Sequence, residues 1–231
     1  KPGIFEIPKF RDRWKFYSEG KVSAQDLSPK DFKGKEQRRA LHCYQSGKPF
    51  FDLEKIRKSL RRWKWPLSYF DIEAITYPIP KFVNSRAWQS IPFEFSCHIQ
   101  QEKDSPIGHS EFLHQDEGDP RLSFIKAMEK AIPKEGSIVV YFAPFEIGRL
   151  KELAKDFPEY APLMHSYIDR IVDLMKVVHD HVFHPEFLGS FSIKKVAPAL
   201  LGKEASYAGL GVKDGMDAMV SYLAMLENPD R

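Results

Sequence analysis

The sequence lacks the features of a membrane or secreted protein. It has no apolar run approaching the roughly 20 residues that a membrane-spanning helix needs. Its first ten residues, KPGIFEIPKF, contain no apolar core of a signal peptide. They also lack an initiator methionine, from which we expect a fragment of a longer protein.

Cysteine is scarce. The two cysteines, Cys43 and Cys97, lie far apart and neither belongs to a CxxC pair. This excludes a disulfide framework and a zinc ribbon, and it predicts a reducing, cytoplasmic setting. The segment HDHVFHP has three closely spaced histidines, but no cysteine or second cluster completes a tetrahedral zinc set. We therefore interpret His179, His181 and His184 as the exposed end of a helix.

The composition is that of a globular protein with an uneven charge distribution. Of 231 residues, 42% are hydrophobic and 13% are aromatic, enough for one large domain or for a domain with an appendage. Residues 1–70 contain 18 Lys and Arg against 8 Asp and Glu, whereas residues 71–231 contain 17 against 24. A basic arm before an acidic body can attract a polyanion, while the body concentrates metal ions. A solvated helical surface explains the charge equally well.

Hydrophobic periodicity predicts a helical first third, followed by strands and helices. The segment LEKIRKSLRRWKW places Leu53, Ile56, Leu60 and Trp63 on one helical face, and Pro66 ends this helix. We expect Trp14, Trp63 and Trp65 to dock the arm. Strands are predicted within 68–78, 91–100 and 110–115, and GSIVVYF reads as a strand covered on both faces. Helices are predicted within 119–132, 145–158, 161–182, 192–202 and 214–226, although RIVDLM can instead be a fifth strand. The pattern predicts an α/β fold in which helices flank a mixed sheet.

Two acids interrupt the first strand, SYFDIEAITYP. Asp71 and Glu73 are two residues apart, so both side chains leave the same face, roughly 6–7 Å apart. Their repulsion and desolvation cost stability, which favours a functional role. A pair of divalent metal ions needs several carboxylates of this kind, and the metals clamp the attacking and leaving oxygens of a phosphodiester.

Two downstream acids also lie at predicted element ends. Glu146 follows the buried strand and begins a helix. Asp217 lies near the start of the last helix, on a face that we expect to be buried together with Val220 and Ser221. Sites on α/β sheets are usually built at such termini. Taken singly, both acids are better explained by a structural role, which for Glu146 is a favourable interaction with the helix dipole.

The four acids, taken in order, resemble a known set. The stretch from about residue 67 to 227 is similar to the DEDD exonuclease superfamily, which has the ribonuclease H-like fold. The resemblance rests on Asp71 and Glu73 in FDIE, on Phe145 followed by Glu146, and on Asp217 followed by Ala218. The strand RIVDLM matches one that carries an acid outside the metal set, here Asp173. More narrowly, IPFEFSCHI, GSIVVYFAPFE and HPEFLGSFSIKKVAPAL resemble an uncharacterised bacterial branch, whose domain often follows a PD-(D/E)XK nuclease-like region.

The resemblance implies a metal-dependent 3′–5′ exonuclease acting on DNA or RNA with two Mg²⁺ or Mn²⁺ ions. It implies a ribonuclease H-like domain at 67–231 after a basic helical extension at 1–66. Asp71 would bridge both metals, and Glu73, Glu146 and Asp217 would complete their ligands. Arg86 and Lys194 are candidate phosphate contacts, and Trp88 is a candidate substrate contact.

Three positions depart from the superfamily pattern. The second acid is a glutamate, Glu146, where an aspartate is usual, and Phe142 replaces the usual asparagine. Val212 and Lys213 occupy the positions of the usual histidine or tyrosine general base. Lys213 could act as the base or contact phosphate, and Tyr207 is a further candidate if its loop folds back. The alternatives are a catalytically impaired nucleic-acid-binding module and a protein-interaction domain.

Overall fold

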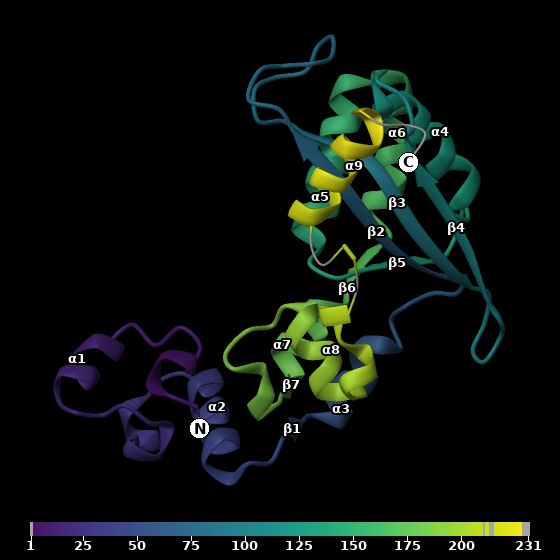
Figure 1. Cartoon of the computed structure of the whole chain (residues 1–231). Helices are drawn as coiled ribbons and strands as arrows, with labels where there is room; N and C mark the ends of the chain where they lie inside the picture. Colours follow the sequence, from purple (N-terminus) through teal and green to yellow (C-terminus); the bar gives the residue numbers. More distant parts are fainter. Residues whose placement is uncertain (1, 210, 213–214, 228–231) are drawn as a thin grey trace. The chain divides into compact units, whose positions relative to one another are not determined.

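The computed structural model describes residues 2–209, 211–212 and 215–227, and the chain divides into two compact units (Figure 1). One unit combines Lys1–Leu60 with Met175–Gly209, and the other combines Arg61–Leu174 with Leu210–Arg231. This division differs from the predicted boundary at residue 66. Residues 175–209 group with the N-terminal segment because their apolar side chains share its core.

A five-stranded mixed sheet, in the order β4-β3-β2-β5-β6, forms the centre of the second unit (Figure 1). The strands are β2 (Leu67–Thr76), β3 (Ser90–Gln100), β4 (Ile107–Leu113), β5 (Ser137–Val140) and β6 (Ile171–Asp173). Neighbours among β2, β3 and β4 are antiparallel, whereas β5 pairs in parallel with both β2 and β6. The predicted α/β class, with a mixed sheet flanked by helices, is confirmed, and RIVDLM supplies the fifth strand.

Three helices pack against this sheet: α4 (Pro120–Ala131), α5 (Ala143–Asp156) and α6 (Ala161–Ile168), the last preceded by a 3₁₀ turn at Pro158–Tyr160. The shared core contains Phe70, Ile72, Phe95, Cys97, Ile138, Val140, Phe124, Met128, Leu150 and Tyr167. All four residues of β5 are buried, as its continuous apolar sequence predicts. Because Phe70 and Ile72 belong to this core, the alternate residues Asp71 and Glu73 leave the opposite face of β2.

Gly136 permits the close approach that starts the β2–β5 pair. Its φ of +85° lies in the left-handed region, and an added Cβ would lie 1.9 Å from the Pro66 carbonyl oxygen. Beside it, the Ser137 amide donates to the Lys64 carbonyl at 2.7 Å, and the Lys64 amide donates to Ser137 Oγ at 2.9 Å. Any larger residue at 136 would therefore shift β5 against β2.

A separate apolar cluster attaches α9 (Gly215–Glu227) to the same unit. Ala218 and Tyr222 are buried with Ile75 and Phe93, and the Tyr222 ring stacks on Phe93 with centroids 4.0 Å apart. Val220 and Ser221 are exposed, so the predicted buried face of this helix was wrong. The aromatic stack fixes the rotation of the helix, and a helical pattern alone leaves that rotation open.

The first unit is mainly helical and has its own core. It contains α1 (Arg13–Ser18), α2 (Lys35–Ser46), β1 (Phe50–Phe51), α3 (Leu53–Leu60), α7 (Leu174–His181, which begins one residue before the unit), β7 (Val182–Phe183) and α8 (Ile193–Leu201). Short 3₁₀ helices lie at Ile4–Glu6, Ala24–Asp26, Pro29–Asp31, Pro185–Phe187, Lys203–Ala205 and Tyr207–Gly209. β1 pairs antiparallel with β7, and the core gathers Ile4, Phe10, Leu41, Tyr44, Val178, Phe183 and Phe187. The N-terminal segment is therefore part of a packed unit.

Two expectations about the arm need correction. The helix predicted to reach Pro66 ends at Leu60, because the backbone amide and carbonyl of Lys64 are already hydrogen-bonded to Ser137. Trp14 and Trp65 are exposed rather than docked, and Trp63 is half-buried. Among the described residues, no helix is both long and apolar enough to span a bilayer.

Candidate functional site

The two acids of β2 lie on the central strand of the sheet. In the register with β3, Asp71 is opposite Ser96 and Glu73 is opposite Glu94. Directly opposed residues on antiparallel strands share a face, so Glu94 joins the two predicted acids. Like charges placed opposite each other destabilise a sheet, and the polar face of β2 and β3 therefore concentrates negative charge at a cost to stability.

Asp71 and Glu94 hold a proton more readily than ordinary carboxyl groups, because the pKa of each is raised. Asp71 is exposed to solvent, yet desolvation by the surrounding protein raises its pKa, against a hydrogen bond from the Ile72 amide. Desolvation also raises the pKa of Glu94, with further contributions from the charges of Asp71 and Glu111. Glu94 is a member of the site that the sequence analysis missed. The alternation in β3 was visible, but the register that places Glu94 opposite Glu73 was not.

Glu146 is the most strongly perturbed acid. It lies in the first turn of α5, directly after β5, and its relative exposure is 2%. Desolvation raises its pKa to about 8, and the charges of Asp71 and Asp173 add to this effect against its own backbone amide and Arg149. Within the described chain, its buried Oε2 atom accepts no hydrogen bond. An unpaired buried carboxyl oxygen is costly, so this position requires a proton or a cation.

Asp173 fixes the start of α5, the helix that contains Glu146. It is the last residue of β6, and its two carboxylate oxygens accept hydrogen bonds from the amides of Phe142, at 3.2 Å, and Ala143, at 3.1 Å. These amides belong to the N-terminus of α5, where helix geometry provides no internal acceptor. Phe142 has a φ of 82°, so Asp173 braces a left-handed residue at the helix start.

The fourth predicted acid approaches from α9. Asp217 is half-buried in the first turn of this helix, and the adjacent Ala218 is buried in the cluster containing Ile75 of β2. Gly215, the first residue of α9, lies so close to β2 that an added Cβ would be 3.2 Å from Glu73 Oε2. The start of α9 therefore faces Glu73, two residues from Asp217.

These acids suit a hard divalent cation chemically, since carboxylate oxygens are its preferred ligands. Asp71 interacts electrostatically with both Glu146 and Glu94, and the buried Oε2 atom of Glu146 has no hydrogen-bond partner in the described part of the chain. Within residues 2–209, 211–212 and 215–227, however, no three His, Cys, Asp or Glu side chains lie close enough together to hold a metal ion. The side chains would have to converge for all four acids to act as ligands.

The residues predicted to bind substrate do not lie together in the structure. Arg86 forms an ion pair with Glu152, and its side chain remains 54% exposed. Lys194 is exposed in α8, and Tyr207 is half-buried; both belong to the first unit, whereas the acids belong to the second. Lys213 lies outside the described residues. Val212, in the usual position of a general base, is an exposed apolar residue.

The three neighbouring histidines have different surroundings. His179 lies 3.1 Å from Glu36 Oε1 and 3.0 Å from Asp180 Oδ1, while His184 Nδ1 accepts a hydrogen bond from the Glu186 amide. His181 is the last residue of α7, as predicted for a helix end, but all three histidines are half-buried rather than exposed, because the helix packs into the core of the first unit.

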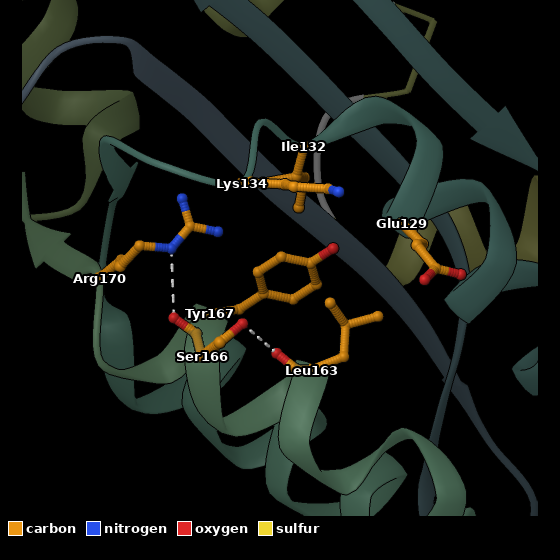
Figure 2. A pocket seen from close by; sticks show the side chains of 7 residues that line it. All are labelled: Glu129, Ile132, Lys134, Leu163, Ser166, Tyr167 and Arg170. Carbon is orange, nitrogen blue, oxygen red and sulfur yellow. Dashed lines mark hydrogen bonds between the residues drawn. The ribbon is translucent and has the colours of Figure 1, made fainter.

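A pocket of about 180 Å³ lies elsewhere in the second unit (Figure 2). It is lined by Glu129, Ile132, Lys134, Leu163, Ser166, Tyr167 and Arg170. Arg170 spans its edge, donating hydrogen bonds to the carbonyl oxygens of Ser166, at 3.2 Å, and Glu135, at 2.8 Å. Lys134 and Arg170 precede β5 and β6, so the pocket lies at the amino ends of these strands. The acids lie at the carboxyl ends, where sites on α/β sheets are usually found.

Comparison with known proteins identifies a family. A family model described as "Domain of unknown function (DUF2779)" matches residues 68–192, which is more than half of the chain. The matched segment contains Asp71, Glu73, Glu94, Glu146 and Asp173 but not Asp217. No curated protein and no solved structure gives a significant match. The chain therefore belongs to the DUF2779 family, whose function is unknown.

Proposed function

We propose that this protein is a metal-dependent 3′–5′ exonuclease with a ribonuclease H-like fold, acting on DNA or RNA with two Mg²⁺ or Mn²⁺ ions. The carrying observation is Glu146, a buried carboxyl group whose Oε2 atom has no hydrogen-bond partner among the described residues and which is coupled electrostatically to Asp71 on the central strand. The mixed sheet, with acids at the carboxyl ends of its parallel strands, also supports the nuclease proposal.

In this proposal Asp71, Glu73, Glu146 and Asp217 hold the ions. Bound divalent ions would polarise the scissile phosphodiester and lower the pKa of an attacking water. Asp173 keeps Glu146 in place through the Phe142 and Ala143 amides. Val212 offers no proton acceptor, and a positioned general base is worth on the order of 10²–10⁴-fold. We therefore expect slow hydrolysis.

Activity should depend on Asp71. We expect end-labelled single strands of DNA or RNA to be shortened from the 3′ end in Mn²⁺. Asp71→Ala should lower the rate by on the order of 10³-fold, because the carboxylate that would hold the metal from the central strand is lost. Glu129→Gln, an exposed acid on α4, is the matched control and should leave the rate unchanged. Gel analysis of the products measures the rate and the polarity. Equal activity in wild type and Asp71→Ala would refute the assignment and indicate a contaminating nuclease.

Metal should also stabilise the fold. Divalent ions bind only the native arrangement of acids, so Mn²⁺ at roughly 100 times its dissociation constant should add about 2.7 kcal/mol, or roughly 5–10 °C in melting temperature. Asp71→Asn should abolish this rise and leave the metal-free protein equally or more stable, since one desolvated charge beside Glu94 and Glu146 is gone. Differential scanning fluorimetry with and without Mn²⁺ measures both effects. An equal Mn²⁺ response in the two proteins would place the metal elsewhere.

The second candidate is a nucleic-acid-binding module that has lost catalysis. It is favoured by the absence, among the described side chains, of a group of three acids or histidines close enough to hold a metal ion. This candidate predicts oligonucleotide binding that is indifferent to Mn²⁺, no hydrolysis, and no metal-induced rise in melting temperature. The two experiments above therefore separate the candidates.

A further inference from the structure

The loop between β2 and β3, residues 77–89, exposes large apolar side chains. Ile79, Val83 and Trp88 are 80%, 83% and 69% exposed. The loop projects beyond the ends of the two strands (Figure 1). Trp and other aromatic residues displayed in this way are typical of binding surfaces.

The loop is held in one conformation by buried polar groups. Arg121, 2% exposed, donates a hydrogen bond to the Val83 carbonyl oxygen at 2.7 Å, and Gln89, 3% exposed, donates to Asp156 Oδ2 at 2.7 Å. The Trp88 amide donates to the Tyr77 carbonyl oxygen at 2.8 Å, which closes the base of the loop. These contacts maintain Trp88 at a φ of 59°, a strained conformation for a bulky residue. A surface side chain presented on a fixed backbone loses little conformational entropy when it binds.

The charge of the loop favours an anionic partner. Residues 77–89 contain Lys81 and Arg86 and no acidic residue. The nearby acids Glu152, Asp156 and Asp119 form ion pairs with Arg86, Arg149 and Arg121, so Lys81 is the loop cation outside these pairs. Flat apolar groups beside positive charge match a chain that alternates bases with phosphates, and stacking on aromatic side chains is sequence-tolerant.

The loop also continues the strand that carries the acids. Five residues separate Asp71 from Thr76, the end of β2, which corresponds to about 17 Å along the strand. Over this length, α9 covers the face of β2 that carries the acids, since Ala218 and Tyr222 pack on Ile75, so the loop is a binding surface beyond α9.

We propose that Trp88 stacks on an unpaired nucleobase, so that the loop selects single-stranded over duplex nucleic acid. This inference rests on the proposed nuclease function. In a duplex the bases are stacked on one another and paired, and their faces are closed to the indole ring. Arg121 is a positioning residue for the loop, whereas Trp88 contacts the substrate.

The test measures binding in EDTA, without hydrolysis, by fluorescence anisotropy of a labelled oligonucleotide of about twelve nucleotides. A matched oligonucleotide of the same length has abasic sites throughout and keeps the phosphates. We expect Trp88→Ala to weaken binding of the base-containing strand by roughly 5- to 140-fold, the equivalent of 1–3 kcal/mol of stacking, and to leave binding of the abasic strand unchanged. Trp88→Phe should retain most of the affinity.

The matched control is Trp14→Ala, a comparably exposed tryptophan in the first unit, which should not alter the difference between the two strands. Melting curves of each variant verify folding.

Two results would overturn the proposal: an equal loss for base-containing and abasic strands, or no loss from Trp88→Ala. Competition by an acidic peptide that is independent of bases would instead indicate a protein partner. The assay needs no metal, so the two proposals can fail separately. If Trp88→Ala weakens binding of the base-containing strand only, and the protein hydrolyses no nucleic acid, the nuclease proposal is refuted and the Trp88 proposal stands.

Discussion

In metal-free buffer, Glu146→Gln should raise the free energy of unfolding at pH 8 by on the order of 3–5 kcal/mol and leave it nearly unchanged at pH 5. The Glu146 carboxyl has a pKa of about 8 in the folded protein against an ordinary value of 4.5, chiefly because burial desolvates it. The folded state therefore keeps this proton up to about pH 8, whereas the unfolded chain releases it near pH 4.5. Between these values unfolding releases a proton, so stability falls as pH rises.

Glutamine matches the shape of the protonated acid and stays neutral at every pH, so the variant should lose this pH dependence. Urea denaturation of both proteins at pH 5 and pH 8 in EDTA measures the difference. Glu129→Gln, on the exposed side of α4, serves as the control and should follow wild type at both pH values. Parallel stability profiles for wild type and Glu146→Gln would show that Glu146 is not buried as an acid.

Arg121→Met should destabilise the sheet-containing unit by about 3–5 kcal/mol. The guanidinium, 2% exposed, pairs with Asp119 at 2.7 Å and with Asp156 at 2.8 Å, and the Asp156 side chain is itself only 7% exposed. Removing the cation leaves a buried carboxylate without its charge partner and leaves the Val83 carbonyl oxygen without its donor. Methionine preserves much of the apolar volume, so the loss is mainly electrostatic.

The matched control for this prediction is Arg86→Met, which breaks a more exposed ion pair with Glu152 and should cost less than about 1 kcal/mol. Chemical denaturation followed by tryptophan fluorescence measures both variants. If Arg121→Met costs no more than Arg86→Met, the buried network does not hold the loop. Trp88 would then lack the fixed backbone on which the single-strand proposal depends.

The sequence by itself determined the α/β class and most of the elements of the sheet. The alternation of side chains in β3 and the continuous apolar run in β5 are local patterns, and each identifies a strand without knowledge of the rest of the fold. The same periodicity placed Asp71 and Glu73 on one face of β2. Glu146 after β5 was likewise readable, because a helix start after a buried strand is a local feature.

The tertiary structure decided which acids meet and how the chain divides. The register of β2 against β3, fixed by pairing over the whole strands, brought Glu94 opposite Glu73. The grouping of residues 175–209 with the N-terminal segment depends on a core assembled from both ends of the sequence. The burial that raises the pKa of Glu146 also requires the packed fold, since desolvation arises only when neighbouring elements exclude water.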